Sequence, residues 1–99
     1  MSTLLNEIPV EDFAALIGEA LPTEAAGQQF ALRVEAVEPS PHPTGRGLPG
    51  FSLQLRGPAE LNLGQGVYAI THPRHGCLQL FITPIRRDPE GLLYEAVFN

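Results

Sequence analysis

The sequence predicts a small, mainly β domain: an antiparallel β-sandwich or partly open barrel that carries one short N-terminal helix. Three observations support this fold class. Residues 67–98 contain three strand-like segments separated by two turn signals. Segments at 30–37 and 51–56 alternate apolar and polar residues with the two-residue period of a half-buried strand. Only residues 9–20 show a helical period, so the rest of the chain is expected to be β-rich. A chain of 99 residues forms one domain, which we place at 1–99.

The expected helix covers about residues 9–20. Its apolar residues recur at the spacing of one helical face, namely Val10, Phe13, Leu16, Ile17 and Ala20. Pro9 suits the first helical turn, because its missing N–H needs no partner there, and Pro22 ends the helix. So short a helix is marginal alone, and we expect its apolar face to dock against the sheet. Residues 23–27 then form a polar connection to the first strand.

The C-terminal meander follows two strands at 30–37 and 51–56. It runs through strand 67–72, turn 73–76, strand 77–83, turn 86–91 and strand 92–98. The middle and last strands contain consecutive apolar residues, which predicts that both of their faces are covered: Leu80, Phe81 and Ile82, then Leu92 and Leu93. We expect the last strand to be an integral part of the fold.

A long loop is expected between the first two strands, at 39–50. It contains four prolines and three glycines, so it can neither continue a β-ladder nor form a helix. Loops of this length inside compact domains commonly bind something or move. We therefore expect a partner-binding loop, with the candidate contact residues His42, Thr44, Arg46 and Leu48.

Composition excludes several classes of partner. Six basic and eleven acidic residues give a net charge of −5, and the arginines are dispersed, so nucleic acid is not an expected ligand. The chain has no lysine, and one cysteine gives no evidence of an oxidising compartment. We see no signal peptide and no apolar stretch that could span a bilayer. We expect synthesis in the cytoplasm, with export in a larger assembly as an open alternative.

A cluster of metal-binding residue types surrounds one turn: His72, His75 and Cys77. Their spacing matches no established zinc site, and alternate residues of a strand point to opposite faces. A Cys–His nucleophile pair would also need an orienting acid and an oxyanion hole, which the sequence does not indicate. We therefore expect no catalytic, cofactor-binding or metal-binding residues, and no cofactor. A ligand or metal site on the 72–77 hairpin is the alternative.

Segments over nearly the whole chain resemble a bacterial family of small uncharacterised domains. They are Phe13-x-x-Leu16-Ile17-Gly18, Phe51-Ser52-Leu53-Gln54-Leu55-Arg56-Gly57-Pro58, Gln65-Gly66-Val67-Tyr68, His72-Pro73, Gly76 and, most specifically, Tyr94-Glu95-Ala96-Val97-Phe98-Asn99. Genes of that family often lie beside genes for phage tail-collar proteins of the microcystin-dependent type. The resemblance transfers no catalytic or metal-binding residue. The loop at 39–50 and Cys77 are not part of the shared pattern.

These observations together predict a non-enzymatic protein–protein interaction domain. The resemblance implies a component or assembly factor of a phage-tail-like fibre system, with tail-collar-like fibre proteins as partners and a homo-oligomer as a further option. Pairing of an exposed sheet edge with another chain is one recognition mode, and the loop at 39–50 is the other candidate interface. A small-ligand or metal-binding protein is the alternative function.

Overall fold

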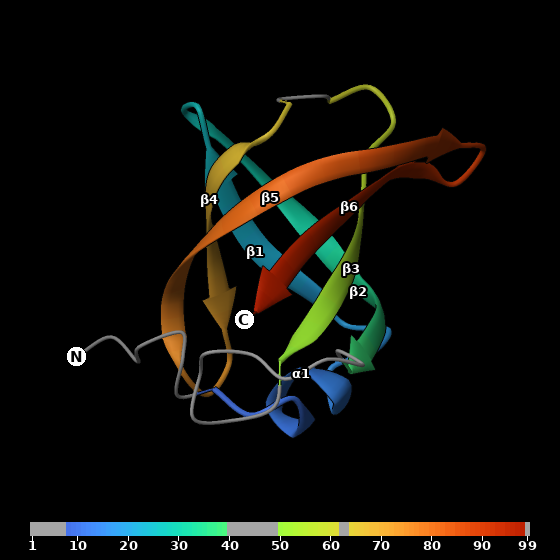
Figure 1. Ribbon diagram of the computed structural model, residues 1–99. Helices are drawn as coiled ribbons and strands as arrows, with labels where there is room; N and C mark the ends of the chain where they lie inside the picture. The colour runs from blue at the N-terminus through green and yellow to red at the C-terminus, as the bar shows by residue number, and fades with distance from the viewer. Residues whose placement is uncertain (1–7, 40–49, 62–63, 99) are drawn as a thin grey trace.

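The computed structural model describes residues 8–39, 50–61 and 64–98 (Figure 1). The elements are α1 (Glu11–Ala14), β1 (Ala20–Ala25), β2 (Gln28–Pro39), β3 (Phe51–Gly57), β4 (Gly66–His72), β5 (Gly76–Asp88) and β6 (Gly91–Phe98). All neighbouring strands are antiparallel, and they close into a barrel in the order β1-β2-β3-β6-β5-β4. The predicted fold class is confirmed: the protein is mainly β with one short N-terminal helix, and its barrel is closed.

An aromatic cluster fills one end of the barrel. The rings of Phe51 and Phe98 stack with centroids 4.4 Å apart, and Phe13 of α1 lies 5.3 Å from Phe98. Phe13 and Phe51 are fully buried. Figure 1 shows α1 below this end of the barrel, so the helix docks through Phe13 as the sequence predicts, whereas Ile17 of the same predicted face is 53% exposed.

The helix is shorter than the predicted span of 9–20, which is a correction to the sequence analysis. After α1, the chain continues through single turns to Gly18, which adopts a φ of 93°. The N–H of Gly18 then donates to the carbonyl of Val34 in β2, and the N–H of Val34 donates to the carbonyl of Glu19. Pairing with β2 thus replaces the last helical turns.

Residues 20–25, placed by the sequence analysis in the helix end and a polar connection, form β1. Its side chains alternate, with Leu21, Thr23 and Ala25 buried. Ala26 and Gly27 both have positive φ, as the tight turn between β1 and β2 requires. β1 is a strand because β2 supplies its ladder, despite a composition that disfavours strands.

The meander over 67–98 corresponds to β4, β5 and β6, which pair in sequence order. β5 continues to Asp88, so the strand predicted at 77–83 is longer, and the turn predicted at 86–91 is shorter, than expected. Both Leu92 and Leu93 are buried, as expected. Phe81 was expected to be covered, and this was wrong: it is 58% exposed, while Leu80 and Ile82 point into the core. β5 lies in the wall of a single barrel, so only its inner face meets the core.

Among the described residues, closure of the barrel gives every strand a neighbour on each side, so the sheet has no free edge strand of the kind expected as one interface, although β1 and β4 pair over only a short stretch. The long strands β2 and β5 each carry a register shift, at Val34/Ala36 and Pro84/Arg86, which lets them bend around the barrel. The predicted contact residues of the loop at 39–50, which are His42, Thr44, Arg46 and Leu48, lie outside the described residues.

Candidate functional site

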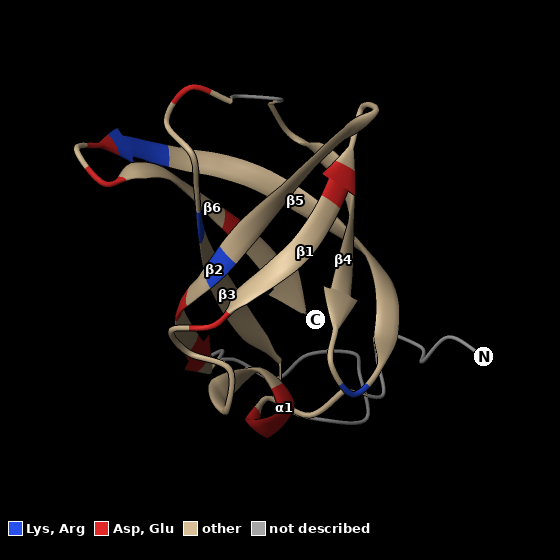
Figure 2. Cartoon of the chain, turned by 180° about the vertical axis from the view of Figure 1, so that it is seen from behind, with Lys and Arg blue, Asp and Glu red and all other residues tan. Residues whose placement is uncertain are grey.

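An uncharged face covers the outside of β4 and β5. It consists of three cross-strand pairs, which we name the β4–β5 face: Val67 with Phe81, Ala69 with Gln79, and Thr71 with Cys77. These residues point outward because the alternate positions of both strands are buried. In Figure 2, β4 carries no charged residue, and charges on β5 occur only at its far end.

The apolar end of this face is unusually accessible. Val67 is 59% exposed and its partner Phe81 is 58% exposed. Thr83 lies on the outer side of β5 with Phe81, and it pairs with Glu95 of β6. Alternate residues of a strand share a face, so Val97 of β6 also faces outward, beside Phe81. Val97 is 54% exposed. Three large apolar side chains therefore present more than half of their surface to solvent on one side of the barrel.

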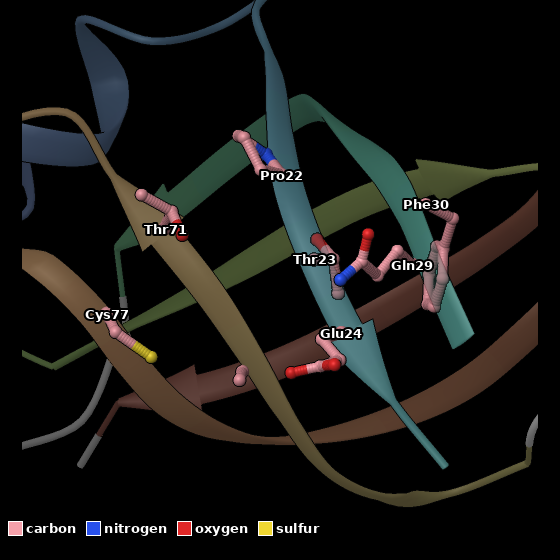
Figure 3. Close-up of a pocket in the computed structure, with 8 residues that line it drawn as sticks. Pro22, Thr23, Glu24, Gln29, Phe30, Thr71 and Cys77 are labelled. Carbon is pink, nitrogen blue, oxygen red and sulfur yellow. The ribbon is translucent and has the colours of Figure 1, made fainter. Parts of the chain in front are cut away.

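A hollow of about 320 Å³ lies at the other end of the β4–β5 face, over the junction of β1 and β4 (Figure 3). The described residues that line it come from four strands and are Pro22, Thr23, Glu24, Gln29, Phe30, Ala69, Thr71 and Cys77. Small side chains on β4 and β5 leave this space open. Glu24 is the single charged residue among these eight.

The barrel is thinly paired beneath this hollow. Only two residue pairs join β1 to β4, Thr23 with Ile70 and Glu24 with Ala69. The buried hydroxyl of Thr23 donates to the carbonyl of Leu21 at 3.0 Å, which gives that carbonyl a partner beside the short ladder. That hydrogen bond lies within β1, so it supports the strand itself, while the backbone pairing of Thr23 and Glu24 with β4 joins the two strands.

His72 has a structural environment. Its Nδ1 accepts hydrogen bonds from the backbone N–H groups of Arg74 and His75, at 3.0 and 3.2 Å. Its Nε2 lies 2.9 Å from the backbone carbonyl of Asp12, which assigns the neutral tautomer with a proton on Nε2. The edge of the ring also contacts Phe13. Burial lowers the pKa of His72, so the neutral form that these contacts require is favoured.

The other members of the predicted cluster point elsewhere. His75 pairs through Nε2 with the carboxylate of Asp12 at 2.5 Å, and Arg74 lies 3.6 Å from the same carboxylate. Cys77 is exposed on the outer face opposite Thr71. Within the residues that the structure describes, no group of three or more His, Cys, Asp or Glu could hold a metal ion. The expectation that the purified protein lacks a transition metal stays a prediction.

A second electrostatic cluster holds the β5–β6 hairpin to the barrel. Arg56 of β3 is only 7% exposed, and its Nη1 donates a hydrogen bond to the carboxylate of Asp88 at 2.6 Å. Its Nη2 lies 3.7 Å from both Glu35 and Glu90. The hydrogen bond from Arg56 lowers the pKa of Asp88, whereas Arg33 contributes most to the lowered pKa of Glu35. These groups pair with one another and bind the strands together.

The β4–β5 face and the hollow were not predicted from the sequence. Alternation along 67–72 was visible, but the sequence alone could not show that the side with Val67 points to solvent. One sequence signal could have indicated the face: the alternate positions 67, 69 and 71, and 77, 79 and 81, of two consecutive strands carry no charged residue. The hollow needs Glu24 and Ala69 side by side, a contact that joins residues far apart in the chain.

In a comparison with known protein families, residues 8–98 match the family described as Domain of unknown function (DUF6916). No curated protein and no solved structure matches the chain. Within the parts of the chain that the structure describes, no helix has the length and apolar character needed to cross a membrane.

Proposed function

We propose, from the premise that this chain belongs to the DUF6916 family, that it is a non-enzymatic protein–protein interaction domain that docks through the β4–β5 face. The biological setting that we propose is a phage-tail-like fibre system, in which the domain is a component or an assembly factor. That setting is suggested by the sequence resemblance to domains encoded beside tail-collar proteins. A second copy of the chain is a further candidate partner.

The observation that supports docking is the exposure of Val67 and Phe81 as a cross-strand pair on an uncharged surface. Apolar burial stabilises association by about 25 cal/mol for each Å² removed from water. Aromatic residues are enriched among the side chains that dominate binding energy, and charged residues are depleted from interface cores. The β4–β5 face has both properties, in a chain whose net charge is −5.

Two features weigh against the alternative of a ligand or metal site on the 72–77 hairpin. Both ring nitrogens of His72 already contact backbone groups, and Cys77 lies on the opposite side of the strand wall. Recruiting His72 as a ligand would require the loss of contacts that join α1 to the turn between β4 and β5.

The proposal is tested by quantitative binding to the products of neighbouring genes, with the protein itself included as a partner. We expect Phe81→Glu to weaken binding at least about tenfold, because loss of a central aromatic typically costs about 2 kcal/mol or more. Ile17→Glu is the matched control, since Ile17 is 53% exposed and lies after α1, off the β4–β5 face. Equal losses in the two variants, or none in Phe81→Glu, would contradict docking through this face.

A further inference from the structure

The hollow beside the β4–β5 face is a recess whose lining contains one charged residue, Glu24. Its volume of about 320 Å³ is at the lower limit of small-molecule sites, which suits one long side chain better than a whole cofactor. Pro22, Ala69 and Thr71 supply apolar and small surface for a side-chain stem. The volume and this lining therefore suit a single side chain with an apolar stem.

Charge defines the chemistry of that occupant. Glu24 is exposed and, within the part of the chain that the structure describes, has no recorded ion pair. Figure 3 shows its carboxylate extending from β1 toward β4. Gln29 is its cross-strand partner on β2, and its side chain amide can supply a second acceptor. An acidic protein with a net charge of −5 attracts basic partners over a longer range as well.

We infer that the hollow receives one arginine side chain of the partner that docks on the β4–β5 face, with its guanidinium against Glu24 and its stem over Ala69. This inference rests on the proposed function, because the hollow adjoins the docking face through Ala69, Thr71 and Cys77. Arginine fits better than lysine. Its planar guanidinium can bind a carboxylate with two parallel hydrogen bonds and can approach the half-buried ring of Phe30.

The test uses n-butylguanidinium as the probe and amide chemical shifts of the isotope-labelled protein as the readout. We expect saturable shifts at Thr23, Glu24, Ala69 and Thr71, and about a fivefold weaker affinity in Glu24→Gln, the size of effect that an exposed ion pair can supply. n-Butanol, which has the same stem without the charge, should produce no saturable shift at these positions.

Two further variants distinguish binding of the probe in the hollow from a general attraction of the cation to acidic side chains on the surface. Ala69→Leu retains Glu24 but fills the hollow, so it should also abolish the saturable shifts. Glu19→Gln removes an exposed carboxylate that does not line the hollow, so it should leave them unchanged. The amide spectrum of each variant also reports whether it is folded.

Absence of saturable shifts in the parent protein, or equal affinity in parent and Glu24→Gln, would overturn the inference. Binding that survives in Ala69→Leu would also overturn it, because the probe would then lie outside the hollow. The titration contains no partner protein, so its failure is distinct from a failure of the Phe81→Glu binding experiment.

Discussion

Replacement of Phe98 by alanine should remove a large part of the stability of the barrel. Phe98 is 5% exposed and contacts two other phenylalanine rings, at 4.4 Å and 5.3 Å. Truncation of a buried phenylalanine typically costs about 3–5 kcal/mol, and each aromatic pair accounts for about 0.5–1.5 kcal/mol. Because Phe98 has two ring partners, we expect Phe98→Ala to lower the free energy of unfolding by about 4–5 kcal/mol. A domain of this size has about 5–15 kcal/mol of stability in total.

Urea unfolding of the parent and the Phe98→Ala variant measures this loss. With a denaturant dependence of about 1.5 kcal/mol per M, the midpoint should fall by about 3 M, or the variant should be unfolded without urea. Phe81→Ala is the matched control, since Phe81 is 58% exposed, and it should cost less than about 1 kcal/mol. A Phe98→Ala variant that loses no more stability than Phe81→Ala would refute the packing of this cluster.

Two further predictions concern pH and backbone geometry. Burial lowers the pKa of His72, so the unfolded chain binds more protons than the folded protein as the pH falls below about 6.5. The contribution of His72 to the free energy of unfolding should therefore be fully present above about pH 6.5 and should decline as the pH falls toward the lowered pKa of the folded state. In urea titrations below about pH 6.5, His72→Asn should show a smaller decline in stability than the parent, and parallel declines in the two proteins would exclude His72 as the cause. Gly91 has a φ of 124°, and an added Cβ would overlap the carbonyl of Gly57. Gly91→Ala should therefore cost more than about 2 kcal/mol, whereas Gly76→Ala, with open space around it, should cost about 1–2 kcal/mol; equal costs would show that the overlap relaxes freely.

Local signals were sufficient for the meander. The turn signals at 73–76 and 86–91 and the apolar segments around them predicted three strands here, and the structure has β4, β5 and β6 in sequence order. Phe13 was also assigned correctly to a docked helical face. These features depend on residues close together in the chain, which a sequence pattern records directly.

Other features depend on contacts between distant residues. Residues 20–25 contain proline, alanine and glutamate, so their strand conformation comes from pairing with β2 and not from intrinsic preference. Closure of the barrel depends on contact between Thr23 and Ile70, which no local pattern indicates. The solvent exposure of Phe81 follows from that closure, and so does the hollow beside Glu24.

The most direct test of the account is hydrogen exchange of the domain alone and in complex with whichever neighbouring gene product it captures. Docking through the β4–β5 face predicts slower amide exchange at 66–72 and 76–83 in the complex than in the domain alone. Amide exchange in β3 should change little, because β3 lies on the opposite side of the barrel from β4. Slower exchange confined to β2 and β3, or to residues 40–49, would contradict the central claim and place the interface elsewhere on the domain.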